Sequence, residues 1–261
     1  MKKVEIFQVD AFTDRVFSGN PAAVCPLDTW LDDSSLQKIA AENNLAETAF
    51  FVRSDDVYRI RWFTPKSEVD LCGHATLASA CVLFEHLGFR EEVLSFQSRS
   101  GVLTVTKNKE WYTLNFPADK IDEIELSATL KSCFDKKPVA AFRGSTDIML
   151  VFSDQNEIQA IKPNLGKIAE YRARGVIVTA RGIETDFVSR FFAPAVGIDE
   201  DPVTGSAHTT LTPYWAKQIG KSDLTAMQIS PRGGFLKCSL VKDRVLISGQ
   251  AVLFLRGEIM F

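Results

Sequence analysis

Two short segments of the sequence combine a glycine with acidic, imidazole or hydroxyl side chains, and both could bind and transform a small anion. The first, LCGHAT, carries Gly73 and His74, and the second, DPVTGSAH, carries Asp201, Gly205 and Ser206. A helix that begins at a glycine presents unpaired backbone N–H groups and a partial positive charge, which bind carboxylate or phosphate. We therefore expect both helix starts to bind an anionic substrate group. The alternative is that each glycine only begins a helix at a sharp turn.

Glu47, in NNLAETAFF, is the main candidate for acid/base chemistry. It directly precedes the apolar run TAFFV, so partial burial would raise the pKa of its carboxyl group toward a value useful for proton transfer. A similar strand in the second half of the chain, GVIVTA, has no acid at the corresponding place. The alternative is an ordinary loop carboxylate or a helix cap, since most glutamates are exposed.

Other titratable residues lie close to the two glycines. His74 could donate a hydrogen bond to the substrate or share a proton with Glu47, and the alternative is a capping role at the helix start. Asp201 lies four residues before the second glycine, close enough to reach the same cleft. Asp70 and His208 are further candidates.

The two glycines belong to two similar halves of the chain. Gly73 and Gly205 each open a segment that closes on another glycine fifteen residues later. Upstream, the matched residues are Arg61, Phe63 and Pro65 in the first half and Arg190, Phe192 and Pro194 in the second. Repeated segments of this kind indicate an internal duplication. We expect an N-terminal lobe at 1–118 and a C-terminal lobe at 119–261 that includes a linker at 119–138, with the active-site cleft between them.

The elements that must position these residues indicate a mixed α/β (α+β) fold. β-rich runs predict strands at 4–9, 48–52, 58–63, 102–106, 175–180, 187–192 and 244–249. Residues 32–44 predict a short amphipathic helix. The segment after Gly73 is apolar on almost every side before Glu85, so its helix must be enclosed, as by a sheet curled around it. Pro213 falls inside the second such helix and should kink it or delay its start.

Composition excludes several classes of protein. The chain has 261 residues, 46% of them hydrophobic, and a net charge of −3, which argues against disorder and against nucleic acid or an anionic membrane as the main partner. Its five cysteines form no CxxC pair, so we expect neither a disulfide framework nor a metal site. The N-terminus lacks the apolar core of a signal peptide, and no run is apolar enough to span a membrane. We therefore expect a cytoplasmic protein.

Four motifs resemble those of the PhzF-like phenazine-biosynthesis family, whose members share the diaminopimelate epimerase fold. They are FQVDAFTDRVFSGNPAAVC, NNLAETAFF, RWFTPKSEVDLCGHAT and EDPVTGSAH, and the resemblance covers nearly the entire chain. It implies two lobes, each a β-barrel around a central helix, and an enzyme that acts without a cofactor and usually assembles as a homodimer.

The resemblance also implies roles for individual residues. Glu47 would move the proton while His74 and Asp201 assist, and the substrate-binding residues would be Asn20, Gly73, Gly205 and Ser206. The related racemising enzymes use two opposed cysteines, but here only Cys72 lies beside a helix-start glycine and the second half has no counterpart. Two-thiol racemisation in its usual form is therefore excluded.

The sequence thus predicts a cofactor-independent isomerase that moves a carbon-bound proton in a small anionic, carboxylate-bearing metabolite by general acid/base catalysis. A one-base epimerase or a lyase that uses the same carboxylate is the nearer alternative. The more distant one is a non-catalytic small-molecule-binding paralogue. Retention of Glu47, His74 and Asp201 together argues against a pure binder, which would need only the helix starts.

Overall fold

The computed structural model describes residues 2–55, 57–171 and 173–261, and the chain forms two compact units. Unit 1 comprises Met1–Asn115 and Ser248–Phe261, and unit 2 comprises Phe116–Ile247. The chain passes from one unit to the other twice, within β8 (Trp111–Pro117) and within β17 (Arg244–Gly249). Among the described helices, none combines the length and the apolar character needed to cross a membrane.

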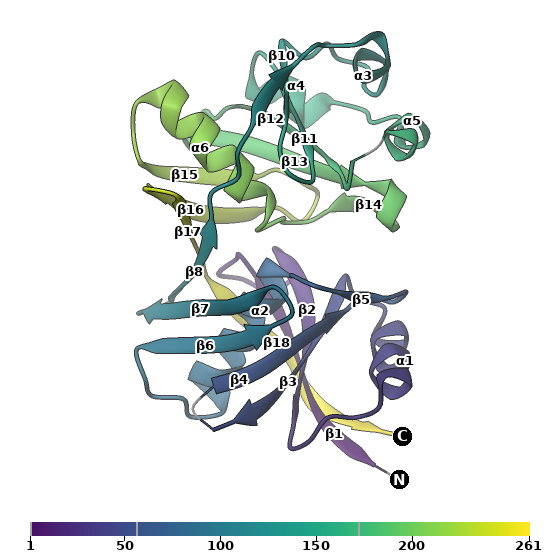
Figure 1. The fold of residues 1–261 in the computed structure, drawn as a ribbon, viewed down its shortest axis with the longest axis vertical. Coiled ribbons are helices and arrows are strands. Elements are labelled where there is room, and N and C mark those ends of the chain that lie inside the picture. Colours follow the sequence, from purple (N-terminus) through teal and green to yellow (C-terminus); the bar gives the residue numbers. More distant parts are fainter. Residues whose placement is uncertain (1, 56, 172) are drawn as a thin grey trace. The chain divides into compact units, whose positions relative to one another are not determined.

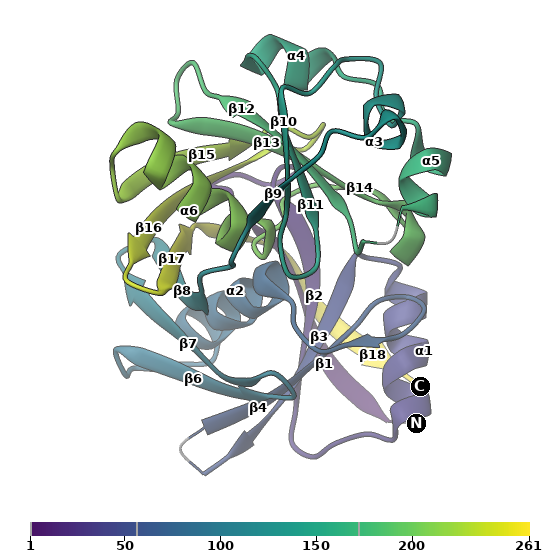
Figure 2. The same ribbon diagram turned by 45° about the horizontal axis from the view of Figure 1, so that its top comes forward.

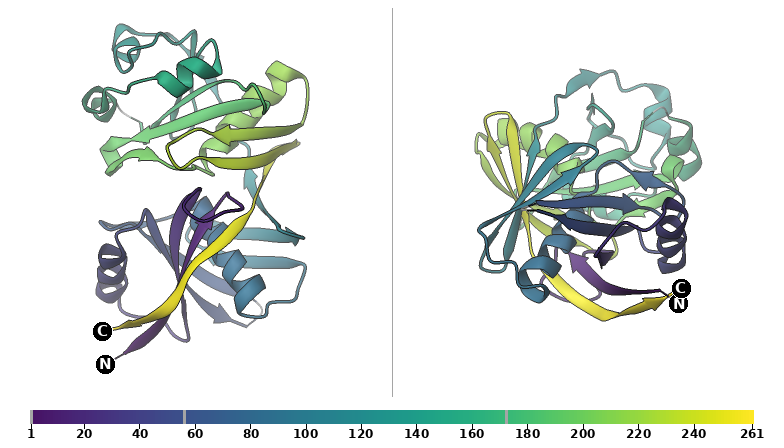
Figure 3. Two further views of the ribbon diagram at one scale, coloured as in Figure 1. Left: turned by 180° about the vertical axis from the view of Figure 1, so that it is seen from behind. Right: turned by 60° about the horizontal axis from the view of Figure 1, so that its bottom comes forward.

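The C-terminal strand belongs to the first unit, which corrects the predicted boundary between lobes 1–118 and 119–261. β18 (Ala251–Met260) pairs antiparallel with β1 (Lys3–Ala11), so that Lys3 lies opposite Met260. Figure 3 shows the two strands side by side, with the two ends of the chain together. A strand that completes the sheet of unit 1 is therefore supplied from the far end of the sequence.

Unit 1 is a strongly curved sheet with one helix inside it and one outside. Its remaining elements are β2 (Asn20–Leu27), α1 (Asp33–Asn43), β3 (Glu47–Ser54), β4 (Val57–Phe63), β5 (Glu68–Val69), α2 (Gly73–Cys81), the π-helical η1 (Val82–His86), β6 (Val93–Ser98) and β7 (Gly101–Asn108). The predicted helix at 32–44 is confirmed as α1, because the Asp32 carboxylate accepts the Ser35 N–H at 3.0 Å and Asn44 ends the helix in the left-handed conformation.

The helix that begins at Gly73 is enclosed, as its composition predicts. All nine residues of α2 are buried, and the helix packs on β1, β2, β3 and β18 (Figure 1). Since a helix with no polar face can only be stable when it is covered on every side, this burial explains the run of small and apolar residues in ATLASAC. The fold fixes the first turn of α2 rigidly against the ends of neighbouring strands.

Unit 2 contains the second set of elements. They are β9 (Asp122–Ile124), α3 (Ala128–Ser132), β10 (Ala140–Arg143), β11 (Ile148–Val151), α4 (Gln155–Ala160), α5 (Leu165–Glu170), β12 (Val176–Arg181), β13 (Phe187–Ala193), the 3₁₀ segment η2 (Pro194–Val196), β14 (Ile198–Asp201), α6 (Ala207–Ile219), β15 (Asp223–Gln228) and β16 (Gly234–Val241). The predicted linker at 119–138 is part of this unit, since β9 pairs with β10 and Leu130 and Phe134 enter its hydrophobic core.

The two units share one strand topology. In unit 1, β1–β2 is antiparallel, β2–β3 parallel, β3–β4 antiparallel, β4–β6 parallel and β6–β7 antiparallel. In unit 2 the same order and directions recur in β10–β11, β11–β12, β12–β13, β13–β15 and β15–β16. Matched residues make matched contacts. Arg61 binds Glu68 and covers the Phe63 ring, and Arg190 binds Glu200 and covers the Phe192 ring. Two similar lobes are therefore present, and their origin by duplication stays a prediction.

Pro213 interrupts α6 without ending it. Proline has no N–H to donate to the carbonyl four residues earlier, which here belongs to Thr209. The Asp119 N–H donates to that Thr209 oxygen instead, at 3.1 Å, and the Thr210 hydroxyl donates to the Asp119 carboxylate at 2.9 Å. The chain that enters unit 2 is thus fastened to α6, which runs along β15 and β16 (Figure 2).

Candidate functional site

Parallel pairing gathers the acid, the amide and the imidazole of unit 1 at one edge of its sheet. β2 and β3 are parallel, with Ala22 opposite Glu47, so the amino ends of both strands lie at the same edge. Asn20 begins β2 and Glu47 begins β3. Because α2 packs on both strands, its first turn brings His74 to these two residues.

The loop before Asn20 has one position that only glycine can occupy without strain. Gly19 has a φ of +67°, and a Cβ added there would lie 2.2 Å from the Ala11 oxygen. The backbone can therefore make the tight approach that returns the chain to the start of β2 only because this residue has no side chain. Asn20, the next residue, is completely buried.

His74 is the centre of the polar cluster. Its Nε2 atom lies 3.2 Å from Glu47 Oε2, which is close in distance but not aligned for a hydrogen bond. Its Nδ1 atom lies 3.2 Å from Asn20 Nδ2 and 3.5 Å from Cys72 Sγ. Since the Asn20 amide nitrogen can only donate, it selects the tautomer of neutral His74 in which the proton is on Nε2, facing Glu47.

Burial sets the charge state of this imidazole. The side chain of His74 is 6% exposed, and that of Glu47 is 12% exposed. Removal from water lowers the pKa of His74 from its ordinary 6.5 to about 3, so the ring is neutral at neutral pH. The contact with Glu47 is then a polar contact between a carboxylate and a neutral imidazole.

Cys72 joins the cluster as the residue immediately before α2. Its backbone is extended, its side chain makes no capping hydrogen bond, and its carbonyl accepts the Thr76 N–H and hydroxyl groups. The sequence left the role of Cys72 open. The structure brings its sulfur atom within contact of His74, so the thiol belongs to the cluster rather than to the core alone.

In unit 2, Asp201 ends β14 and is held in a compact polar turn. Its carboxylate accepts the Thr204 hydroxyl, and the buried Gln228 donates to the Asp201 carbonyl at 2.7 Å while accepting the Thr204 N–H at 2.9 Å. Gln228, at the end of β15, carried no signal in the sequence. Its completely buried amide fixes the approach to α6.

The second helix begins later than predicted. α6 starts at Ala207, while Gly205 lies in a turn in which N–H groups bond to carbonyls three residues earlier, as from His208 to Gly205 at 3.1 Å. This tighter turn places Ser206 at the cap position. The prediction that Gly205 itself begins the helix is therefore wrong by two residues, although Gly73 does begin α2.

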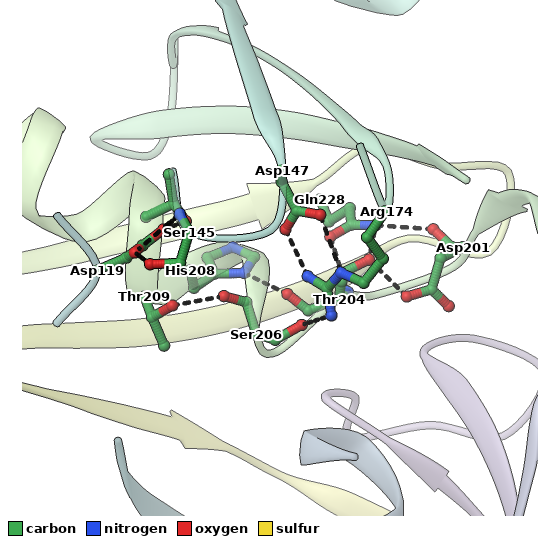
Figure 4. Close-up of polar contacts among 11 residues, drawn as sticks. Asp119, Ser145, Asp147, Arg174, Asp201, Thr204, Ser206, His208, Thr209 and Gln228 are labelled. Atoms are coloured by element: carbon green, nitrogen blue, oxygen red, sulfur yellow. Dashed lines mark hydrogen bonds and ion pairs between the residues drawn. The ribbon is translucent and has the colours of Figure 1, made fainter. Parts of the chain in front are cut away.

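An arginine that the sequence analysis missed binds Ser206. Arg174 donates from Nη1 to Ser206 Oγ at 3.0 Å, and its other guanidinium nitrogens bind both oxygens of Asp147 (Figure 4). The Asp147 side chain is only 2% exposed. Burial alone would lower the pKa of Arg174, but the hydrogen bonds and charge of Asp147, with the charge of Asp201, raise it above its ordinary value. We call Arg174, Asp147 and Ser206 the arginine clamp.

Two other candidates lie outside these clusters. The Asp70 side chain is 73% exposed and faces Arg99, so it is a surface carboxylate. His208 is completely buried, its Nδ1 atom lies 2.9 Å from the Thr204 carbonyl, and burial lowers its pKa to about 4. The structure therefore groups Asn20, Glu47, Gly73 and His74 in unit 1, and groups Asp201, Gly205 and Ser206 in unit 2.

Comparisons with known proteins identify the family of the chain. The sequence model of the family described as "Phenazine biosynthesis-like protein" (PhzC-PhzF) matches residues 9–257. An uncharacterised isomerase of Pseudomonas aeruginosa is 53% identical over 258 residues, which are 98% of this chain and 98% of that protein.

Solved structures show the same relationship. The crystal structure of a PhzF-family phenazine biosynthesis protein from Enterococcus faecalis matches with a TM-score of 0.97 and 46% identity, covering 100% of both chains. A hydroxyproline epimerase from Agrobacterium vitis, 9% identical with a TM-score of 0.63 over 98% of this chain and 92% of that one, shares the fold alone. The chain is therefore an enzyme of the isomerase class and belongs to the Phenazine biosynthesis-like protein family.

Proposed function

We propose that this isomerase moves a carbon-bound proton within a small carboxylate-bearing metabolite, with Glu47 as the group that takes and returns the proton. The observation that carries the proposal is the 3.2 Å approach of His74 Nε2 to Glu47 Oε2 beside the first turn of α2. The names of close relatives as isomerases support the reaction class.

The proposed step needs no oxidant or reductant. The Glu47 carboxylate takes a proton from a carbon next to an electron-withdrawing group, and the electron pair left on that carbon delocalises into the group. Glu47, now a carboxylic acid, returns the proton to another carbon of the same molecule. General acid/base catalysis contributes typically about 10²- to 10⁴-fold, so positioning and stabilisation of the developing charge supply the rest.

His74 orients Glu47 in this proposal. The Asn20 amide holds the Nε2 proton of the imidazole toward the carboxylate, and a small rotation of Glu47 would align the contact as a hydrogen bond. Catalytic hydrogen bonds are often poorly aligned before substrate binds. Because His74 is neutral, it orients the base without placing a positive charge beside it.

The first turn of α2 would bind the carboxylate of the substrate. Its N–H groups have no acceptors within the helix, and Gly73 allows an anion to approach the backbone closely. Asp201, Gly205 and Ser206 keep their predicted roles in assisting catalysis and binding substrate. The arginine clamp supports the role of Ser206, since Arg174 fixes the hydroxyl oxygen and leaves its proton available to an anion.

We extend the proposal to a cofactor-independent, cytoplasmic homodimer, as the family resemblance implies. Apolar side chains exposed on unit 1 support a second copy of the chain as partner. Phe17 is 71% exposed and Phe254 is 44% exposed, and their ring centroids lie 5.7 Å apart. Sedimentation velocity of the protein and of Phe254→Asp tests this. A dimer that the substitution dissociates is expected, and a monomeric protein would contradict it.

The test of the reaction is NMR in D₂O with a panel of cyclic and amino-substituted carboxylic acids. The wild type is expected to place deuterium at a substrate carbon or to form a new isomer, whereas Glu47→Gln is not. Glu42→Gln, the same change at an exposed position of α1 five residues earlier, serves as the matched control and should behave like the wild type.

Each alternative has its own outcome in this test. A stereoisomer inverted at the exchanging carbon identifies an epimerase, and a product that has lost a group identifies a lyase. A panel member that binds tightly and is recovered unchanged and undeuterated identifies a binding paralogue. Equal exchange by the wild type and Glu47→Gln would remove Glu47 from the mechanism.

A further inference from the structure

Three side chains of unit 1 direct different metal-binding atoms to one place. A carboxylate oxygen of Glu47, the sulfur of Cys72 and an imidazole nitrogen of His74 all lie within 4.8 Å of one another. Carboxylate, thiolate and imidazole are the three side-chain groups that bind Zn²⁺ in proteins. All three residues are largely shielded from water.

One of the separations is already close to that of a bound ion. Around a tetrahedral Zn²⁺ with bonds of about 2.0–2.3 Å, ligand atoms lie roughly 3.5 Å apart. The Glu47 and His74 atoms, at 3.2 Å, already meet this requirement. The Cys72 sulfur, which lies 3.5 Å from His74 Nδ1, would complete the set by a side-chain rotation that brings it to the Nε2 side of the ring.

The imidazole is oriented for this role. Nε2 of His74 faces Glu47, is buried, and has no aligned hydrogen bond, while Nδ1 faces Asn20. A histidine that binds metal through Nε2 donates its Nδ1–H to a partner that fixes the ring. Rotation of the Asn20 amide by about 180° would present its oxygen to that proton, so one residue can hold both the ion-free and the ion-bound ring.

We propose that Glu47, Cys72 and His74 form a binding site for a zinc-class divalent cation, and that the bound ion inhibits the enzyme. Binding displaces the thiol proton to solvent, and the thiolate and carboxylate charges then balance the charge of the ion. Three protein ligands leave a fourth position for water. The cation site goes beyond the proposed function, and its inhibitory effect rests on that function, because a Glu47 carboxylate that binds the ion is a weaker base and is turned toward the ion.

The ligand set also determines which ions bind. Soft or borderline ions such as Zn²⁺ and Co²⁺ suit thiolate and imidazole, whereas Mg²⁺ and Ca²⁺ prefer oxygen ligands. The expected inhibition is therefore by Zn²⁺ and Co²⁺ but not by Mg²⁺ at the same concentration, and it should be reversed by a chelator.

Optical titration with Co²⁺ tests the site without a substrate, so its outcome is independent of the proposed reaction. The wild type is expected to bind one equivalent and to develop the near-ultraviolet thiolate-to-cobalt band. Cys72→Ser should lack the band, and its Zn²⁺ dissociation constant, measured by competition, should rise at least about tenfold. Cys81→Ser, the same change at the other end of α2, is the matched control. It should keep the thiolate-to-cobalt band and the wild-type Zn²⁺ dissociation constant.

A second variant keeps the test decisive if Cys72→Ser does not fold. His74→Asn preserves the contact with Asn20 but lacks Nε2, and it too should weaken Zn²⁺ binding at least about tenfold. Absence of the thiolate band in the wild type at saturating Co²⁺, or its persistence in Cys72→Ser, would overturn the site. Undiminished deuterium exchange by the Zn²⁺-loaded wild type, on a substrate found by NMR, would overturn the inhibition.

Discussion

Unit 1 and unit 2 place different chemistry at the same point of one topology. Thr48 lies opposite Phe63 in unit 1, and Val176 lies opposite Phe192 in unit 2. Since the two phenylalanines match in sequence, the residue that corresponds to Glu47 is Gly175. A side chain added there would have to displace the Phe191 ring, because a Cβ at Gly175 would lie 2.4 Å from that ring. The position that carries the acid in one unit is therefore closed in the other.

The residue next to that closed position carries the opposite charge. Arg174 precedes Gly175 and binds Ser206 and Asp147, whereas Glu47 in unit 1 lies beside a neutral imidazole. A single topology thus supports the contact of Glu47 with a neutral imidazole in unit 1 and the arginine clamp in unit 2. The two units therefore share a topology and differ in the residues at the starts of β3 and β12.

Loss of the arginine clamp should have the largest effect on stability. Arg174→Ala leaves the buried Asp147 carboxylate without its cation, and we expect the free energy of unfolding to fall by about 3–5 kcal/mol. Urea denaturation at neutral pH measures this. Lys3→Ala, which removes an exposed ion pair with Glu258, should lower the free energy of unfolding by no more than about 1 kcal/mol. Equal costs for the two variants would show that the clamp does not stabilise unit 2.

Acid should destabilise both units through their buried histidines. The pKa of His74 is about 3 and that of His208 about 4 in the folded protein, against an ordinary 6.5. The unfolded chain therefore takes up protons first. The stability that depends on the neutral rings is fully present above pH 6.5, and it is lost as the pH falls toward 4 for His208 and toward 3 for His74. Each histidine contributes a slope of at most about 1.4 kcal/mol per pH unit.

The same substitution at His74 and His208 should affect stability in both units but proton transfer in only one. His74→Asn and His208→Asn should each reduce the slope of unfolding free energy between pH 6.5 and 4, whereas only His74→Asn should also slow proton transfer. Denaturation at several pH values and deuterium exchange measure the two effects. An unchanged slope in both variants would contradict the neutral, buried state of the rings.

A methyl group at Gly175 should lower the free energy of unfolding by less than the loss of the arginine clamp does. We expect Gly175→Ala to lower the free energy of unfolding by about 1–3 kcal/mol, because the Phe191 ring must move. Gly166→Ala in α5, where the nearest atom lies 3.6 Å from the added carbon, should be neutral or stabilising. If Gly175→Ala were as harmless as Gly166→Ala, an acid could be accommodated at this position.

The smallest effects should come from the two matched arginines. Arg61→Lys and Arg190→Lys keep the positive charge but lose the paired hydrogen bonds that each guanidinium donates to Glu68 or Glu200. We expect each substitution to lower the free energy of unfolding by about 1–2 kcal/mol. Thermal unfolding of both variants should show similar losses. A large effect for one and none for the other would weaken the equivalence of the two units.

Local patterns predicted the elements and the acid/base cluster well. The N-cap at Asp32, the apolar helix after Gly73 and the alternating strands all depend on neighbouring residues, and those elements are confirmed. Glu47 and His74, predicted to share a proton, lie in contact. The adjacent Gly73 and His74 predicted this contact because the start of α2 itself positions the His74 ring.

Long-range pairings could not be predicted in the same way. β18 joins β1 across almost the entire chain, and no local pattern distinguishes this partner from a strand of the second half. Arg174 and Asp147 meet because β11 and β12 are parallel, which places their amino ends together. A sign in the sequence was available, since Arg174 directly precedes the predicted strand GVIVTA, but its meaning depends on the pairing.

The most direct test of the account compares Glu47→Gln with Asp201→Asn in deuterium exchange on one identified substrate. Each variant is first shown to unfold at the wild-type temperature. We expect Glu47→Gln to lower the exchange rate by about 10²- to 10⁴-fold, while Asp201→Asn lowers it less and keeps measurable exchange. Exchange that persists in Glu47→Gln and vanishes in Asp201→Asn would place the proton-transfer group in unit 2 and rule out the role proposed for Glu47.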